Sequence, residues 1–158
     1  MKRRHVILGA LSALALTIGG VAPFAVADNG KHSGIQHFLL LQTGTESNGP
    51  QALIATGPIH AAGTDVVLSD TLDRFVFPRG NVRVKHTPQA SHDSFDPVTC
   101  LGTFTETGTY RLVGGSGAYA DVSGHGTYRV QASFVGCSQT EPPSVFTLQI
   151  KAHGPISF

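Results

Sequence analysis

Asp73 and His86 are the two side chains of this sequence whose types and spacing best suit chemistry. They stand at the two ends of a short segment with the pattern of a hairpin, which brings its ends together. A carboxylate beside an imidazole orients the ring and raises its basicity, above all where an apolar wall excludes water. The pair therefore predicts either a general base or a hydrogen bond that closes one end of a core. The hydrogen bond is the commoner arrangement, because buried polar groups are ordinarily paired.

The hairpin that would position this pair has its predicted tight turn at Arg79-Gly80. Apolar and polar residues alternate on both sides of the turn, as in strands with one buried face. The implied register places Phe77 opposite Val82, Phe75 opposite Val84 and Asp73 opposite His86. The other face then carries Arg74 against Lys85, a like-charge pair that requires solvent. We therefore expect the apolar ladder to face the interior of a barrel, with Asp73 and His86 near one mouth.

Six side chains are predicted to face the interior and to contact a bound ligand. They are Phe75, Phe77, Val82, Val84, Tyr110 and Tyr128. The two tyrosines come from similar Gly-Thr-Tyr-Arg segments on either side of a glycine-rich connection. In a barrel of about eight strands such side chains either line a cavity or fill the interior completely. The sequence leaves both possibilities open.

Other chemistries find less support. The seven histidines that follow residue 27 show no His-x-x-x-His or similar ligand spacing, so we predict no metal site and no cofactor. Ser116 lies in a Gly-Gly-Ser-Gly-Ala run that resembles a nucleophile elbow, but that motif requires a strand leading into a helix. No helix is predicted after Ser116. The glycines are therefore expected to form tight turns.

Cys100 and Cys137 are the two cysteines of the sequence, so one intramolecular disulfide is possible. An even number of cysteines in a small exported domain indicates a bridge. Neither belongs to a Cys-x-x-Cys motif or has an adjacent histidine, which argues against a redox or metal-binding role. Closing this loop would stabilise the fold by roughly 4 kcal/mol.

Residues 1–27 have the pattern of a cleavable signal peptide. Three basic residues at positions 2–4 precede an apolar run, and Ala25-Val26-Ala27 supplies small residues before the expected cleavage site. The general secretory route and the twin-arginine route both remain open. We therefore expect a secreted protein with no stable membrane insertion after cleavage.

Removal of this leader from the 158-residue chain leaves 131 residues, enough for one core. We expect a flexible arm over residues 28–34 and a single domain over residues 35–158. Eight Lys and Arg then stand against ten Asp and Glu. This balance lacks the clustered basic residues of a nucleic-acid-binding protein, so no nucleic acid is expected as a partner.

Short runs of β-branched and aromatic residues alternate with turns rich in Gly, Pro, Ser and Thr, and no segment keeps a helical period. The predicted strands span residues 35–42, 51–60, 64–69, 71–78, 81–86, 100–113 with a break at Gly108, 123–135 and 144–153. Loops are predicted at residues 43–50, 87–97 and 138–143. The pattern predicts an all-β fold, an antiparallel closed β-barrel of about eight strands that leaves no exposed edge, with a β-sandwich as the alternative.

Two stretches resemble a largely uncharacterised family of secreted actinobacterial proteins, whose domain is similar to the allene oxide cyclase and dirigent β-barrels. The first is Asp73-x-Phe75-x-Phe77-Pro78-x-Gly80 with His86, followed by Thr99-Cys100. The second is Gly114-Gly115-Ser116-Gly117-Ala118-Tyr119 with Gly124 and Gly126. The resemblance spans roughly residues 51–153 and implies an eight-stranded antiparallel barrel with an apolar interior, as in other small closed barrels. It assigns no catalytic residue to this sequence.

Three functions are compatible with these observations. The leading hypothesis is a binding module for a small hydrophobic molecule, held near the predicted apolar ladder. The alternative is an isomerase or cyclase similar to allene oxide cyclase, in which Asp73 and His86 polarise or deprotonate the substrate. A third is a non-catalytic surface or interaction protein that uses its glycine-rich loops. A cavity of several hundred cubic ångströms inside the barrel would favour the first two hypotheses over the third.

Overall fold

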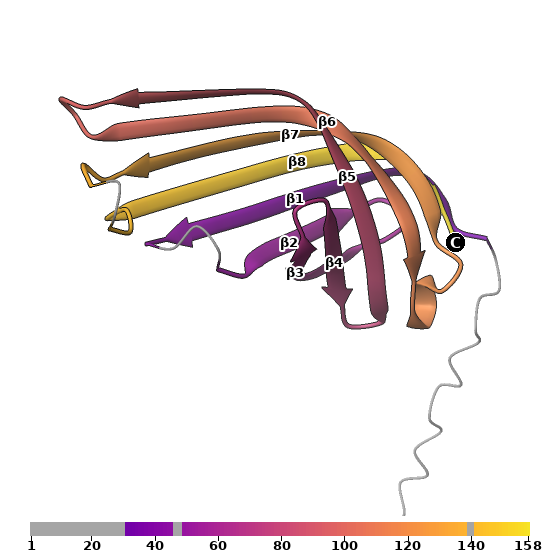
Figure 1. The fold of residues 1–158 in the computed structure, drawn as a ribbon. Coiled ribbons are helices and arrows are strands. Elements are labelled where there is room, and N and C mark those ends of the chain that lie inside the picture. The colour runs from indigo at the N-terminus through magenta and orange to yellow at the C-terminus, as the bar shows by residue number, and fades with distance from the viewer. Residues whose placement is uncertain (1–30, 46–48, 139–140) are drawn as a thin grey trace, which may run out of the picture.

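The computed structural model describes residues 31–45, 49–138 and 141–158. The predicted signal peptide at residues 1–27 and the start of the predicted arm lie outside the described residues. Eight antiparallel strands close into a barrel in the order β1-β2-β3-β4-β5-β6-β7-β8, which confirms the predicted fold and excludes the sandwich (Figure 1). The strands are β1 (Ser33–Gly44), β2 (Gln51–Thr56), β3 (Ala61–Ser69), β4 (Leu72–Phe77), β5 (Gly80–Asp96), β6 (Leu101–Gly115), β7 (Ser123–Val135) and β8 (Val145–Ser157).

The strands have unequal lengths, which divides the molecule into two regions. The strands β2, β3 and β4 contain 6, 9 and 6 residues, whereas the other five contain 12 to 17. The long strands therefore project beyond the short ones as a curved sheet of a single layer (Figure 1). We call this sheet the extension, formed by residues 92–96, 101–105, 131–135, 145–149 and 41–44, which pair across in that order. The remainder of the strands forms the closed barrel.

The predicted loop over residues 87–97 is wrong, because β5 continues to Asp96 and pairs with β6 along this whole stretch. Its polar composition hid the strand, which pairs with β6 across the turn at residues 97–100. The pairing register shifts between Pro88 and Ala90, opposite Gly108. The predicted break at Gly108 is therefore an irregularity of β5, and β6 itself is continuous. Since β4 pairs with β5 only as far as Lys85, Pro88 lies on a free edge, where proline is tolerated.

Other strand boundaries also differ from the prediction. The first strand begins at Ser33, inside the predicted arm, and β2 ends at Thr56, so residues 57–60 form the turn to β3. The last strand continues to Ser157 through Pro155, whose Cα partner is Ile35 on β1. The first and last strands are extended because they pair with each other, whereas β2 ends early because residues 57–60 form the hairpin turn.

The β4–β5 hairpin has its two-residue turn at Pro78-Arg79, one position earlier than predicted. The observed Cα partners are Phe77 with Gly80, Phe75 with Val82, Asp73 with Val84, and Arg74 with Arg83. The predicted facing pairs are therefore wrong by two residues. Because side chains alternate between faces with a period of two, this shift leaves every residue on its predicted face. Phe75, Phe77, Val82 and Val84 are all buried, as expected.

One end of the closed barrel is filled by side chains. Ile59 and Val82 are 1% and 0% exposed there, and the amide of the buried Gln36 donates to the Ile59 carbonyl and accepts from its N–H. The short 3-10 helix η1 (Gly117–Tyr119) places Tyr119 edge-on against Phe77, with ring centroids 5.7 Å apart. These contacts seal the end at which the chain passes from β4 to β5.

The glycine-rich connection between β6 and β7 forms tight turns, as predicted. Gly117 has a φ of 60°, a conformation that favours glycine. A Cβ at Gly115 or Gly117 would meet backbone atoms of neighbouring turns, so only glycine allows η1 to pack this closely. The Asn81 N–H donates a hydrogen bond to the side-chain oxygen of Ser116, at 3.1 Å. Its role in the structure is that of a turn residue.

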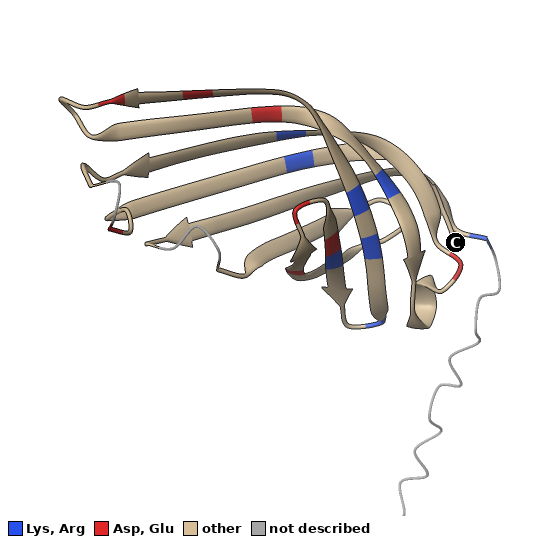
Figure 2. Ribbon diagram, in the orientation of Figure 1, with Lys and Arg blue, Asp and Glu red and all other residues tan. Residues whose placement is uncertain are grey.

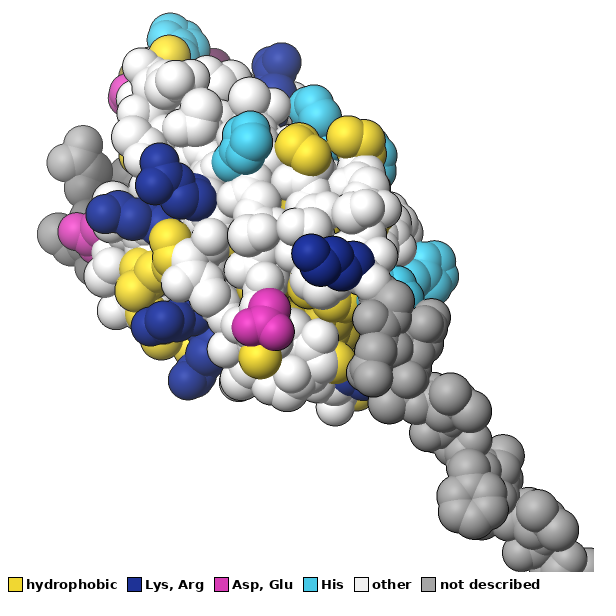
Figure 3. Space-filling model, turned by 90° about the vertical axis from the view of Figure 1, so that its right-hand side faces the viewer, with side chains coloured by type: hydrophobic (Ala, Val, Ile, Leu, Met, Phe, Trp, Pro, Cys, Tyr) yellow, Lys and Arg dark blue, Asp and Glu magenta, His cyan; other side chains and the backbone are white. Residues whose placement is uncertain are grey.

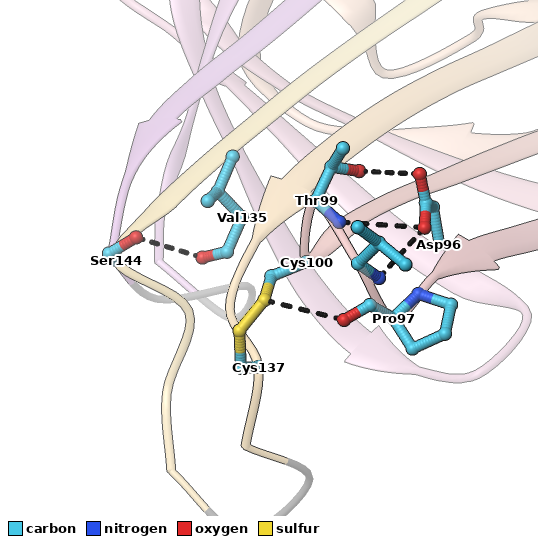
Figure 4. The surroundings of a disulfide bond; sticks show 8 residues. Asp96, Pro97, Thr99, Cys100, Val135, Cys137 and Ser144 are labelled. Atoms are coloured by element: carbon cyan, nitrogen blue, oxygen red, sulfur yellow. Dashed lines mark hydrogen bonds between the residues drawn. A yellow bond between two sulfur atoms is a disulfide. The ribbon is translucent and has the colours of Figure 1, made fainter.

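The predicted disulfide between Cys100 and Cys137 is present, with Cα atoms 4.7 Å apart (Figure 4). It joins the β5–β6 turn to the segment that follows β7, at the tip of the extension. Beside it the Asp96 carboxylate accepts hydrogen bonds from the Val98 N–H and the Thr99 hydroxyl, each at 2.8 Å. The Thr99 and Val98 hydrogen bonds hold the pKa of Asp96 below its ordinary value. In the described part of the chain, no helix is long and apolar enough to cross a membrane.

Candidate ligand cavity

A cavity of about 290 Å³ lies inside the barrel. It is found at the mouth where β2, β3 and β4 end and the five long strands continue. Its wall is mostly apolar and includes Phe38, Leu40, Phe75, Val84 and Val130. Its volume stands at the lower edge of the roughly 300–1,000 Å³ that ligand pockets usually have. The interior is therefore filled at one end and hollow at the other.

The predicted ligand-contacting residues divide between these two ends. Phe75, Val84, Tyr110 and Tyr128 line the cavity. Phe77 and Val82 are not among its lining residues and pack in the filled end below it. The two that miss the cavity are those closest to the hairpin turn. Alternation along a strand predicts whether a side chain points inward or outward. Whether an inward side chain reaches the cavity depends on which end of the barrel is filled by side chains of the other strands.

Asp73 and His86 form an ion pair at the cavity mouth, with 3.3 Å between Asp73 Oδ2 and His86 Nε2. Their side chains are 16% and 24% exposed. The two residues are not direct partners, because Asp73 faces Val84, and the side chains meet along the diagonal of the ladder. The His86 ring also lies edge-on to Tyr128, with centroids 5.8 Å apart. The predicted proximity is thus present, while a catalytic role stays a prediction.

Asp65 is the functional candidate that sequence reasoning missed. It lies in the middle of β3 with 4% exposure, opposite Phe75 on β4. Burial, and secondly the charge of Asp73, raise its pKa to about 7, although the Val66 N–H acts in the opposite direction. Its Oδ1 has no hydrogen-bond partner among the described residues. The sequence feature that indicates its position is the two-residue alternation of the strand, which places Asp65 on the same inward face as Gly63 and Val67.

The pKa of Asp73 is also raised, chiefly by burial, while the nearby His86 lowers it. Two carboxyl groups close to one another in a poorly solvated site resist carrying two charges at once. At neutral pH, Asp65 is therefore distributed between its protonated and ionised forms. As a protonated acid, it can donate a hydrogen bond into the cavity.

Two tyrosines and the Glu106 carboxylate also belong to the polar part of the lining. The Tyr128 hydroxyl donates to Glu106 Oε1 at 2.7 Å, and burial together with this hydrogen bond raises the pKa of Tyr128. Burial raises the pKa of Tyr110 to about 12, and its hydroxyl has no hydrogen-bond partner in the described part of the chain. Both phenols therefore remain protonated at neutral pH. They offer hydroxyl groups to a bound molecule.

The apolar wall of the cavity continues onto the concave face of the extension. Two rows of Cα partners follow the cavity outward, first Phe104, Ala132 and Leu148, then Gly102, Phe134 and Phe146. The Phe134 ring lies over Gly102, where any Cβ would collide with it, and stacks on Phe95 at 6.3 Å. A bound molecule that is longer than the cavity can thus follow an apolar surface out of the barrel.

Among the residues that the structure describes, no group of three or more His, Cys, Asp and Glu side chains is arranged to hold a metal ion. The carboxylates around the cavity have the geometry of hydrogen-bonding groups. Asp73 pairs with His86 and Glu106 with Tyr128. They suit a ligand with hydroxyl or amine hydrogens at one end.

Comparisons with known proteins give little further information. No family model matches the sequence, and no curated protein matches it. Among solved structures, the chain is similar to a pterocarpan synthase dirigent protein at 10% identity, covering 78% of this chain and 86% of that one, with a TM-score of 0.19. Dirigent barrels are one of the two classes that the sequence resembles, but a TM-score this low supports no argument. The barrel fold is established by the strand pairing alone. Membership of the secreted actinobacterial family stays a prediction.

Proposed function

We propose that the protein binds a small, largely apolar molecule that carries a hydrogen-bond donor at one end. The observation that carries this proposal is the cavity of about 290 Å³, whose lining combines an apolar wall with a group of polar side chains. Asp65 is the central member of that cluster, since its buried Oδ1 lacks a partner in the described chain. A buried polar atom without a partner costs free energy that a ligand hydrogen bond would recover.

The expected orientation of the ligand follows from the positions of the apolar and polar side chains in the cavity. The apolar part of the ligand lies against Phe38, Phe75 and Val130, and its donor points to Asp65. A carboxylate at that end would meet Asp65, Asp73 and Glu106, which repel it once they are ionised. The site is therefore expected to prefer a fatty alcohol to the fatty acid of equal length.

Calorimetry with 1-decanol and decanoate at pH 8 tests this proposal. We expect decanol to bind at least about tenfold more tightly, which corresponds to about 1.4 kcal/mol. Val130→Phe fills the cavity and should abolish decanol binding. Val113→Phe, on the outward face of β6 with 38% exposure, is the matched control and should leave it unchanged. Equal binding of decanol to the Val130→Phe variant and the parent protein would contradict the proposal.

A second function, an isomerase or cyclase, is favoured by one specific observation. Asp65, with a pKa of about 7, can give a proton, and the neighbouring Asp73 and His86 can accept one. An isomerisation moves a proton from one atom to another and needs no co-reactant. His86→Ala should then stop turnover of an unsaturated fatty-acid epoxide while decanol still binds. Unchanged turnover in this variant would remove His86 from the chemistry.

We also infer that the protein works outside the cytoplasm. The Cys100–Cys137 disulfide supports this location, because such bonds rarely persist in the cytosol. The predicted leader at residues 1–27 supports it independently. N-terminal sequencing of protein from the culture medium should give Asp28 as the first residue. Recovery of the uncleaved chain from the cytosol alone would contradict the inference.

A further inference from the structure

The charges of this protein are segregated between the two faces of its sheet. Three carboxylates that face inward from the strands, Asp65, Asp73 and Glu106, are among the side chains that line the cavity. Six cations occupy exposed positions that alternate with inward-facing residues on β4 to β8, and we call these strand faces the outer wall. The six are Arg74, Arg83, Lys85, Arg111, Arg129 and Lys151. The blue bands in Figure 2 accordingly run across successive strands.

The remaining described carboxylates lie away from this wall. Asp70 and Asp121 are in turns, Glu141 is in the β7–β8 connection, and Asp93 and Asp96 are near the tip of β5. On the face shown in Figure 3, Lys, Arg and His side chains are spread over the surface and carboxylates are scattered. The chain from residue 28 has more acidic than basic residues, so the positive wall results from folding and not from composition.

The strand register places the cations of the wall in like-charge pairs. Cα partners are Arg74 with Arg83, Lys85 with Arg111, and Arg129 with Lys151. The ion pair between His86 and Asp73 involves none of them, and no Lys or Arg of the described residues has a carboxylate within 4.0 Å. Like charges directly opposite one another destabilise a sheet. Three such pairs on one wall create a positive potential that a bound anion would offset.

A row of polar side chains runs between these pairs. Thr87, Thr109, Thr127 and His153 are successive Cα partners across β5, β6, β7 and β8. Lys85 and Arg111 stand two residues to one side of this row, and Arg129 and Lys151 stand two residues to the other, about 7 Å away along the strands. A groove of about 790 Å³ follows part of the row and is lined by Lys85, Thr87, Thr109, Arg111, Ser123 and His125.

We propose that this outer wall is a second binding site, which takes a linear anionic polysaccharide. Hydroxyl groups of the threonine row would bind sugar hydroxyls, and the cations on both sides would bind acidic groups along both edges of the polymer. The row crosses four strands, about 14 Å, which is long enough for a short oligosaccharide. The site is separate from the cavity, since its residues point to the opposite face of the sheet.

Two other anionic partners fit the wall less well. A membrane is flat, whereas the six cations are distributed around the convex side of five strands, so a bilayer would reach only some of them. Single-stranded nucleic acid binds through stacking of its bases on aromatic side chains. The outward positions of β4 to β8 in the described chain contain no Phe or Tyr. A flexible polymer rich in hydroxyl groups matches both the curvature and the side chains.

Binding to heparin, a sulfated linear polysaccharide, tests the proposal with the intact protein. The key variant is Lys85→Gln with Arg111→Gln. Its matched control is Lys31→Gln with Arg79→Gln, which removes two exposed cations outside the threonine row. Affinity should fall at least about tenfold in the key variant at low ionic strength, and should change less than about twofold in the control. Decanol affinity of both variants verifies that the cavity remains folded.

Three results would overturn the proposal. The first is absence of heparin binding by the parent protein at low ionic strength. The second is an equal loss in the key variant and its control, which would mean that only overall charge matters. The third is binding of phosphatidylglycerol vesicles or of an oligothymidylate as tight as that of heparin. None of these results bears on decanol binding, so failure here is distinct from failure of the cavity proposal.

Discussion

The closed barrel and the extension are built from the same strands but are stabilised in different ways. In the closed barrel, side chains from all eight strands meet, and Val82 is 0% exposed. The extension has five strands, and none of the described residues forms a second layer opposite its concave face, so Phe95 keeps 43% of its surface exposed. The disulfide lies at the tip of the extension, where few side chains can be buried. A covalent link thus stands where packing is weakest, and the cavity lies at the junction of the two regions.

The largest difference between the two regions should appear on truncation of an aromatic core residue. Phe77→Ala in the closed barrel should lower the free energy of unfolding by about 3–5 kcal/mol, since it leaves a cavity in a filled core. Phe95→Ala in the extension should cost no more than about 1.5 kcal/mol, the value of an aromatic pair. Urea unfolding of both variants measures the two losses. Equal losses would show that the extension is packed as tightly as the barrel.

At the junction, burial of Asp65 should make the stability of the protein depend on pH. The unfolded Asp65 loses its proton near pH 4, whereas the buried native residue holds it until about pH 7, so the native state binds the extra proton in between. Stability should therefore fall as pH rises from about 4 to 7, by up to about 4 kcal/mol from this residue. Asp65→Asn should weaken this dependence of stability on pH and should stabilise the protein at pH 8. The raised pKa of Asp73 leaves some slope in place.

Chemical denaturation of Asp65→Asn and the parent protein at pH 4, 6 and 8 checks this prediction. The carboxamide retains the size of the carboxyl group and carries no charge at any of these values. A parent protein whose stability rises from pH 4 to pH 7 would show that Asp65 is ionised without penalty. The cavity would then lack the protonated donor on which the isomerase hypothesis depends.

Removal of the disulfide should affect the extension more than the barrel. Replacing Cys100 and Cys137 by Ser should lower stability by about 2–4 kcal/mol through the greater freedom of the unfolded chain. Hydrogen exchange should show the native-state change in residues 92–105 and 131–135, while the amide of Val82 keeps its protection. Uniform loss of protection over all eight strands would mean that the two regions unfold as one unit.

The smallest effect is expected on the outer wall. Lys85→Glu converts a like-charge pair with Arg111 into an opposite-charge pair, which should stabilise the sheet by about 0.2–1 kcal/mol. Thermal unfolding at low and high salt measures the gain, which should shrink as salt screens the charges. A loss of stability would mean that Lys85 has favourable contacts in the native state. The same variant should bind heparin more weakly, so stability and binding are expected to change in opposite directions.

The β4–β5 hairpin and β5 show how far sequence reasoning reaches. Alternation placed Phe75, Phe77, Val82 and Val84 on the correct face even though the turn was assigned one residue late. It failed for residues 87–97, because their polar side chains form a strand only through pairing with β6. It also gave Asp65 no chemical role, since the burial that raises its pKa arises only when the strands close into the barrel.

The sequence by itself determined the all-β class, the inward face of each hairpin strand and the only possible disulfide. These properties depend on a two-residue period, on turn residues and on a count of cysteines, all of which are local. Only the tertiary structure decided the length of β5, the depth of each inward side chain, the cavity and the separation of cations from carboxylates. Each of these depends on register between strands and on the volume that their side chains fill together, which no single segment contains.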